Sequence, residues 1–186
     1  MVLYPAPELT GLQLHLLQFN HADELFTLID SNRDHLRPWL PWVDATRAVE
    51  DSQSFIRTSL EIFINSRAPT LGIFFQGRLA GVISFNTINS HNQVAEIGYW
   101  LARDFQGQGI MTRAAACLVT YGFAELKLHR IQIRAATENR PSRAVAERLG
   151  FTLEGVLRET EWLYDRFVDH ALYAVLSSEW PGCWRR

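Results

Sequence analysis

The stretch Arg103-Asp104-Phe105-Gln106-Gly107-Gln108-Gly109-Ile110-Met111-Thr112 separates an extended segment, residues 94–101, from an apolar run, residues 110–126. That run contains no proline and few polar residues, so the order predicted is strand, glycine turn, buried helix. The two glycines permit backbone angles closed to other residues and let a ligand approach the main chain. The first amides of a helix lack internal partners and carry partial positive charge. The stretch therefore predicts a phosphate site.

The residues after the second glycine exclude two familiar nucleotide motifs. A nucleotide P-loop needs Gly-Lys-Ser/Thr, whereas Ile110 and Met111 follow Gly109 here. A dinucleotide fingerprint needs a third glycine where this chain has Thr112. The residues alone leave two interpretations open, a phosphate site of another kind or a plain turn between strand and helix.

The segment 106–112 resembles the acyl-coenzyme A pyrophosphate loop of the GNAT superfamily of N-acetyltransferases. Further segments resemble its ribosomal-protein branch, the RimJ/RimL type, in the same order along residues 12–175. They are Arg37-Pro38-Trp39-Leu40-Pro41-Trp42, Ile97-Gly98-Tyr99-Trp100-Leu101, Asn139-Arg140-Pro141-Ser142, Leu149-Gly150-Phe151 and Glu161-Trp162-Leu163.

This resemblance implies acetyl-CoA as co-substrate, with no metal. The residues implied to bind the coenzyme are Ile97, Tyr99, Leu101, Gln106, Gly107, Gln108, Gly109, Ile110, Met111, Thr112, Asn139 and Ser142. One position departs from the superfamily, which often has Gln or Arg three residues before the first loop glycine. Asp104 stands there, so the amides with Gln106 or Arg113 would have to hold the phosphates.

Composition sets the broad class of the protein. With 186 residues, 47% of them hydrophobic and 20% charged, the chain is expected to be one globular domain, residues 1–186, with its core at about 12–176. A net charge of -2 gives no basic surface for nucleic acid. No signal peptide or membrane segment is evident, and Cys117 and Cys183 make no disulfide framework, so a cytoplasmic protein is expected. Relatives of this branch often pair, so a homodimer is one expectation.

Periodicity predicts strands at 12–16, 70–75, 79–85, 94–101, 129–135, 151–159 and 170–176. Helices are predicted at 20–31, 49–66, 110–126 and 139–149, with a short one at 32–35 and a tail from Ser177. Residues 86–92 are expected to form a polar turn. The fold class is therefore α/β, with a mixed, mostly antiparallel sheet flanked by helices. The resemblance adds that two parallel neighbours splay apart at the coenzyme cleft.

Direct transfer of acetyl from a thioester to an amine requires an acid for the departing thiolate. The resemblance places that acid at Ser142, in the first turn of the predicted helix, where serine ordinarily serves as a cap. Asn139 is the expected N-cap, and the resemblance also gives it a hydrogen bond to coenzyme or substrate. The tyrosine that many superfamily members use as the acid is replaced by Ala146.

Two carboxylates are candidates for the base that accepts the proton of the amine. Glu161 stands in the branch-specific segment beside Trp162, an aromatic neighbour expected to desolvate it. Glu96 occupies the superfamily's commoner position, on the strand before the cleft. The ordinary alternative for either is a solvated surface acid. Glu161 is preferred, and Glu96 is kept as the second candidate.

Trp39 and Trp42 are expected either to plug the core or, together with Tyr99 and Glu161, to line a substrate groove. An α-amine with a pKa near 8 is about 10% neutral at pH 7, whereas lysine is far less so. A single carboxylate therefore suits an N-terminal amine, and the favoured function is acetylation of the N-terminus of a ribosomal or other protein. A small amine, polyamine or amine antibiotic is the alternative substrate. A non-catalytic acyl-CoA sensor is the alternative outside enzymes.

Overall fold

The computed structural model describes residues 10–181, and these belong to two compact units. The first unit holds residues up to 84 together with 99–111, and the second holds 85–98 and the chain from residue 112. The boundaries fall within two strands and one helix, so no separate linker joins the units.

The strands of the first unit form an antiparallel ladder. β1 (Leu12–Leu16) pairs with β2 (Thr70–Phe75), and β2 pairs with β3 (Arg78–Asn89), whose residues up to Ser84 belong to this unit. The β2–β3 turn places Gln76 and Gly77 at φ of 51° and 77°, the left-handed geometry of a tight hairpin. This hairpin confirms the prediction made from residues 70–85.

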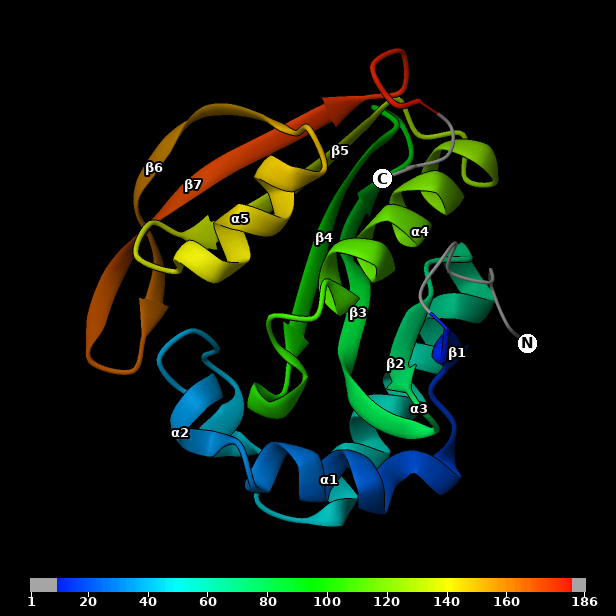
Figure 1. Ribbon diagram of the computed structural model, residues 1–186, viewed down its shortest axis with the longest axis vertical. Coiled ribbons are helices and arrows are strands. Elements are labelled where there is room, and N and C mark those ends of the chain that lie inside the picture. Colours follow the sequence, from blue (N-terminus) through cyan, green and yellow to red (C-terminus); the bar gives the residue numbers. More distant parts are fainter. Residues whose placement is uncertain (1–9, 182–186) are drawn as a thin grey trace. The chain divides into compact units, whose positions relative to one another are not determined.

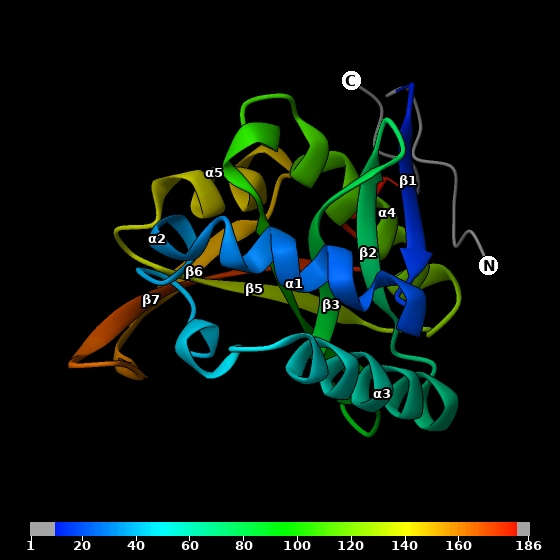
Figure 2. The ribbon, with the colours of Figure 1, turned by 90° about the horizontal axis from the view of Figure 1, so that it is seen from below.

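Helices α1 (Ala22–Asp30) and α3 (Val49–Ser66) pack together in the first unit (Figure 2), with the short α2 (Arg33–Leu36) between them in sequence. α3 begins where the Asp51 carboxylate accepts the amides of Arg47 and Ala48, at 2.8 and 3.0 Å. α1 docks on β3 as Glu24 accepts the Leu79 amide at 2.8 Å. The buried core beneath them is apolar and consists of Leu17, Ala22, Leu25, Ile29, Ile56, Leu79 and Val82.

β4 (Val94–Leu101), whose residues up to Gly98 belong to the second unit, runs parallel to β5 (Arg130–Ala136). In this unit β7 (Arg166–Leu176) pairs antiparallel with both β5 and β6 (Thr152–Leu163). β6 and β7 form the long hairpin drawn in orange and red in Figure 1. Helices α4 (Ile110–Ala124) and α5 (Arg140–Arg148) precede β5 and β6 in sequence. The hydrogen-bonded order is β1-β2-β3-β4-β5-β7-β6, a mixed sheet that confirms the predicted fold class.

Three strand boundaries differ from the prediction by more than one residue, and one of them is the start of β7, at Arg166 rather than at residue 170. β3 continues to Asn89, through a segment expected to be a polar turn, because β-branched Thr87 and Ile88 favour an extended backbone even with polar neighbours. β6 runs to Leu163 rather than ending at Glu159, because the hairpin turns on Tyr164 and Asp165 without a glycine to mark it.

The chain after β7 was expected to be a tail, yet its described part packs on α4. Trp180 is 8% exposed, its Nε1 donates to Thr120 Oγ1 at 3.1 Å, and its ring lies 6.4 Å from that of Phe123. Cys117 is buried within the same helix, as expected, whereas Cys183 lies outside the described residues. In the stretch 10–181, no helix is both long and apolar enough to cross a membrane.

Candidate active site

The predicted phosphate turn opens α4. After a single 3-10 turn (Arg103–Phe105), Gly107 and Gly109 both adopt φ of 72°, and the helix begins at Ile110. A Cβ placed on Gly107 would meet nothing within 4 Å, and the turn is exposed from Gln106 to Gln108. The turn thus offers helix-start amides beside open space, which fits a diphosphate. Ile110, Met111 and Thr112 bury their side chains, so only their backbone could serve a ligand.

Two side chains near α2 hold this turn from within the first unit. Asn32 Oδ1 accepts the Arg103 amide at 3.0 Å. His35 Nε2 lies 3.3 Å from the Leu101 carbonyl and 3.0 Å from Gln106 Nε2. Asn32 and His35 therefore fix the approach to the glycines, a role that sequence reasoning missed because they lie about 70 positions away in the chain.

The side chains of β4 that were expected to bind the coenzyme are buried or half-buried, so its backbone is the part left for a ligand. Ile97 and Leu101 are 1% and 8% exposed, and Tyr99 is half-buried. Between β4 and β5 the parallel ladder joins residues 94–97 to 130–133, and no further rung follows among the described residues. The ladder between β4 and β5 thus ends at Ile97 and Ile133 in the described chain, and the splay of these strands stays a prediction.

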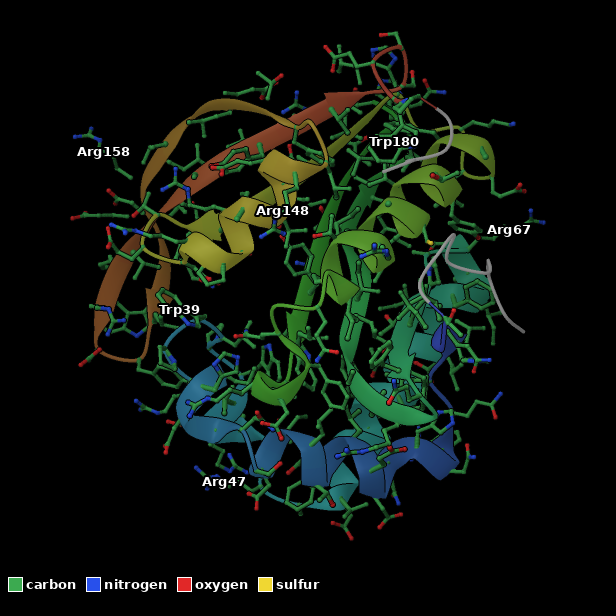
Figure 3. The ribbon with its side chains drawn as sticks, viewed as in Figure 1. Trp39, Arg47, Arg67, Arg148, Arg158 and Trp180 are labelled. Atoms are coloured by element: carbon green, nitrogen blue, oxygen red, sulfur yellow. The ribbon has the colours of Figure 1, made fainter. Side chains whose placement is uncertain are left out.

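The tryptophan segment before α3 contributes to the core of the first unit. Trp42 packs against the buried cluster beneath α1 and α3, and its ring lies 6.1 Å from that of Trp100. Trp39, labelled in Figure 3, is half-buried, and its amide donates to Leu36 at 3.0 Å. The expectation of a plug over the core is confirmed for Trp42. A role for either ring in a substrate groove stays a prediction.

The candidate acid lies in the first turn of α5. Asn139 Oδ1 accepts the Ser142 amide at 3.2 Å, which confirms Asn139 as the N-cap of this helix. This capping hydrogen bond uses the backbone amide of Ser142 and not the hydroxyl of Ser142. Ser142 is half-buried.

A buried tyrosine fixes α5 to β7. Arg143 Nε donates to the Tyr173 hydroxyl at 3.0 Å, and that hydroxyl donates to Glu147 Oε1 at 2.7 Å. Burial raises the pKa of Tyr173, and the hydrogen bond to Glu147 adds to the shift, so the phenol stays protonated at neutral pH. Tyr173 therefore anchors the helix that carries Ser142.

Arg148, at the end of α5, is a cation that sequence reasoning overlooked. It extends toward α4 (Figure 3), and its Nη1 donates to the buried Thr112 Oγ1 at 2.9 Å. Arg148 is exposed and has no ion pair with an acid among residues 10–181. A guanidinium thus lies beside Thr112, in the first turn of α4.

The two candidate bases have different surroundings. Glu96 is 6% exposed and bound by Arg134 and Gln132, so it is a buried ion-pair partner rather than a surface acid. Glu161 is 33% exposed at its side chain, and its Oε2 lies 3.1 Å from His170 Nε2. Trp162 instead contacts Phe167, with ring centroids 4.8 Å apart. Because neighbouring strand residues face opposite sides, His170 rather than Trp162 covers Glu161, and this corrects the expectation.

Within the described range, no three His, Cys, Asp or Glu side chains are grouped to hold a metal ion.

Comparisons with known proteins agree with these features. The family model described as Acetyltransferase (GNAT) domain matches residues 12–152. The Escherichia coli (strain K12) ribosomal-protein-serine acetyltransferase is 37% identical over 164 residues, covering 88% of this chain and 92% of that protein.

Two solved structures are similar over nearly the whole chain. The microcin C7 self-immunity acetyltransferase MccE, in complex with acetyl-CoA and AMP, has 35% identity and a TM-score of 0.87, covering 94% of this chain and 98% of that one. The ribosomal L7/L12 α-N-protein acetyltransferase RimL, in complex with coenzyme A, has 33% identity and a TM-score of 0.87, covering 92% and 97%. This chain therefore belongs to the GNAT family of acetyltransferases and is an acetyl-CoA-dependent N-acetyltransferase.

Proposed function

We propose that this protein acetylates the N-terminal α-amine of a protein, with a ribosomal protein as the favoured substrate. The glycine turn at the start of α4 carries the coenzyme part of the proposal, because its left-handed glycines leave open space beside helix-start amides. The substrate part is supported by similarity to the ribosomal-protein-serine acetyltransferase over 88% of this chain. The whole chain acts as one acetyltransferase domain.

In the proposed reaction, the amine nitrogen attacks the thioester carbonyl, and the carbon–sulfur bond then breaks. Glu161 takes the proton that the amine loses, and Ser142 gives a proton to the departing thiolate and regains one from solvent. Backbone amides from Gly107 to Thr112 bind the diphosphate, and Arg148 adds positive charge at the same helix start. Asn139 keeps the Ser142 turn in place through its cap.

Glu161 fits the base better than Glu96 because of what each touches. Arg134 occupies both oxygens of Glu96, whereas Glu161 contacts a histidine and keeps about a third of its side chain exposed. The work asked of this base is modest for an α-amine, which needs roughly 2.4 pKa units less help than lysine. That difference, about 3 kcal/mol, favours an N-terminal substrate.

A small amine-bearing molecule is the second candidate substrate. The observation that favours it is the similarity to MccE, whose structure contains acetyl-CoA and AMP. We further propose a cytoplasmic location, which suits the buried, reduced cysteine Cys117, and a homodimeric assembly.

Intact-mass spectrometry tests both candidates directly. The protein is incubated with acetyl-CoA and either ribosomal proteins or a library of peptides and small amines. A gain of about 42 Da, the mass of one acetyl group replacing hydrogen, identifies the substrate, and fragmentation locates it at the N-terminus or on a side chain. Peptides with a blocked N-terminus serve as the matched control. Acetylation of small amines alone would overturn the N-terminal proposal in favour of the second candidate.

A further inference from the structure

We propose that His170 is a positioning residue for Glu161, holding the carboxylate of the candidate base through its Nε2. This inference rests on the proposed role of Glu161 and adds a residue that no motif indicated. The starting observation is the 3.1 Å approach of His170 Nε2 to Glu161 Oε2, with the His170 side chain only 12% exposed.

A β-bulge brings these two side chains together. Leu157 pairs with His170, and Glu161 pairs with Val168, so three residues of β6 stand opposite one residue of β7. Glu159 takes a left-handed φ of 48° within the bulge, and its amide donates to Asp169 Oδ1 at 2.7 Å. Bulges of this kind redirect the side chains that follow them. Here the residue that follows is the candidate base.

The residues paired with His170 on the flanking strands are apolar, and the polar group near its ring is the carboxylate of Glu161. On the flanking strands, His170 stands beside Ala136 and Leu157, which are both apolar. Its two ring nitrogens are buried and have no hydrogen-bond partner of good geometry in the described chain. A hydrogen on Nδ1 would therefore be a buried, unsatisfied donor, which is costly. The ring is thus assigned its hydrogen on Nε2, facing the carboxylate.

This arrangement fixes one oxygen of Glu161 and leaves the other for the substrate proton. The Nε2 approach is close but off the hydrogen-bond direction, so a small rotation of either side chain completes the bond. Catalytic hydrogen bonds often tighten in this way when substrate binds. A glutamate on an exposed hairpin has many rotamers, and a buried partner restricts them before the amine arrives.

Kinetics of paired variants test the role. His170→Leu removes the donor but keeps apolar bulk, and should lower kcat about 10- to 100-fold, with KM for acetyl-CoA little changed. His170→Gln restores a donor close to Nε2 and should recover most of the rate. In a Glu161→Gln background, His170→Leu should cost nothing further, because the carboxylate it positions is gone. An equal loss in both backgrounds would overturn the proposal.

A measurement without turnover separates this inference from the proposed function. Nitrogen NMR of the His170 ring should report the Nε2–H tautomer, and Glu161→Gln should shift the Nε2 resonance. An Nδ1–H tautomer, or resonances that ignore Glu161→Gln, would refute the contact whether or not a substrate is known. Wild-type acetyl transfer by Glu161→Gln, with the NMR signature intact, would instead count against the proposed role of Glu161.

Discussion

The guanidinium of Arg134 binds the carboxylate of Glu96 through two contacts, Nε to Oε2 at 2.6 Å and Nη2 to Oε1 at 3.0 Å. Gln132 adds a third from Nε2 to Oε2, at 3.2 Å. Glu96 and Gln132 are also partners in the parallel ladder of β4 and β5. The side-chain cluster therefore ties together the last part of β4 that pairs with β5.

Glu96→Gln should accordingly act on stability. Removing the charge leaves Arg134 without its partner, and Arg134 is 36% exposed, so solvent softens the loss to about 1–3 kcal/mol. Urea unfolding checks this value. Arg134→Gln is the matched comparison and should cost more, because it leaves the buried carboxylate of Glu96 without its cation.

Glu161→Gln should act on turnover. The variant keeps the shape of the side chain but cannot take the proton, so the rate at pH 7 should fall. The rate should partly recover as pH rises and the amine deprotonates unaided, near about pH 8 for an α-amine and much higher for lysine. Glu96→Gln, measured as the control, should lack this alkaline recovery. The opposite pattern in the two variants would assign the base to Glu96.

Gly109→Val should abolish tight coenzyme binding, because its Cβ would occupy space that the phosphate needs. Valine at a φ of 72° also strains the backbone, so a folding control is needed. Gly77→Val supplies it, since Gly77 has a similar φ of 77° in the β2–β3 turn. Calorimetry with acetyl-CoA should show weak binding only for Gly109→Val. Equal affinity in both folded variants would remove the turn from the coenzyme site.

Ser142→Ala should reduce turnover by ~10²-fold or more, the range for a general acid, while coenzyme binding persists. The amide capped by Asn139 remains in this variant, so α5 should keep its first turn. Ser54→Ala is a matched control, because it removes a helical hydroxyl that donates to the Glu50 carbonyl in α3. A Ser142→Ala enzyme as fast as wild type in a chemistry-limited assay would exclude this acid.

Arg148→Gln should weaken acetyl-CoA binding about 10-fold, and the loss should shrink as salt concentration rises. Arg158→Gln is the control, because Arg158 projects outward from β6 (Figure 3). Titration calorimetry at two ionic strengths measures both variants. Equal affinities for the two would show that Arg148 only braces Thr112.

The pair of Glu154 and Arg130 makes a prediction about pH. Two hydrogen bonds from Arg130, each 2.5 Å long, hold the pKa of Glu154 below its ordinary value. The pair therefore stabilises the fold above the unfolded pKa of glutamate, and that contribution is lost as pH falls through the lowered pKa. Glu154→Gln should cost at most about 1 kcal/mol at pH 7, because the carboxylate is partly exposed. Unfolding at pH 7 and pH 3 should show the two proteins converging in acid.

Local chemistry made most of the fold predictable. The span of α3 and the left-handed glycines before α4 follow from periodicity and from glycine's freedom, both of which are readable in a short window. The ends of two strands were less predictable. Polar residues mask the β-branched Thr87 and Ile88 at the end of β3, and β6 continues past Glu159 where residues 161–163 pair with β7.

The site was predictable where a motif existed and obscure where it depended on tertiary contacts. Asn139 and Ser142 are three positions apart, and their cap follows from that spacing. His35, Arg148 and His170 act on residues that other elements bring to them, so no local pattern marks them. The expectation that Trp162 covers Glu161 was wrong because neighbouring residues of a strand point to opposite faces of the sheet.

The bulge at Glu159 also determines which side chains of β6 after it face His170. Side chains alternate along β6, so deleting one residue between Leu157 and Glu161 would shift the register by one. Trp162 would then stand opposite Val168, and an indole would face His170 where a carboxylate does now. The hairpin would then present an aromatic ring in place of the candidate base.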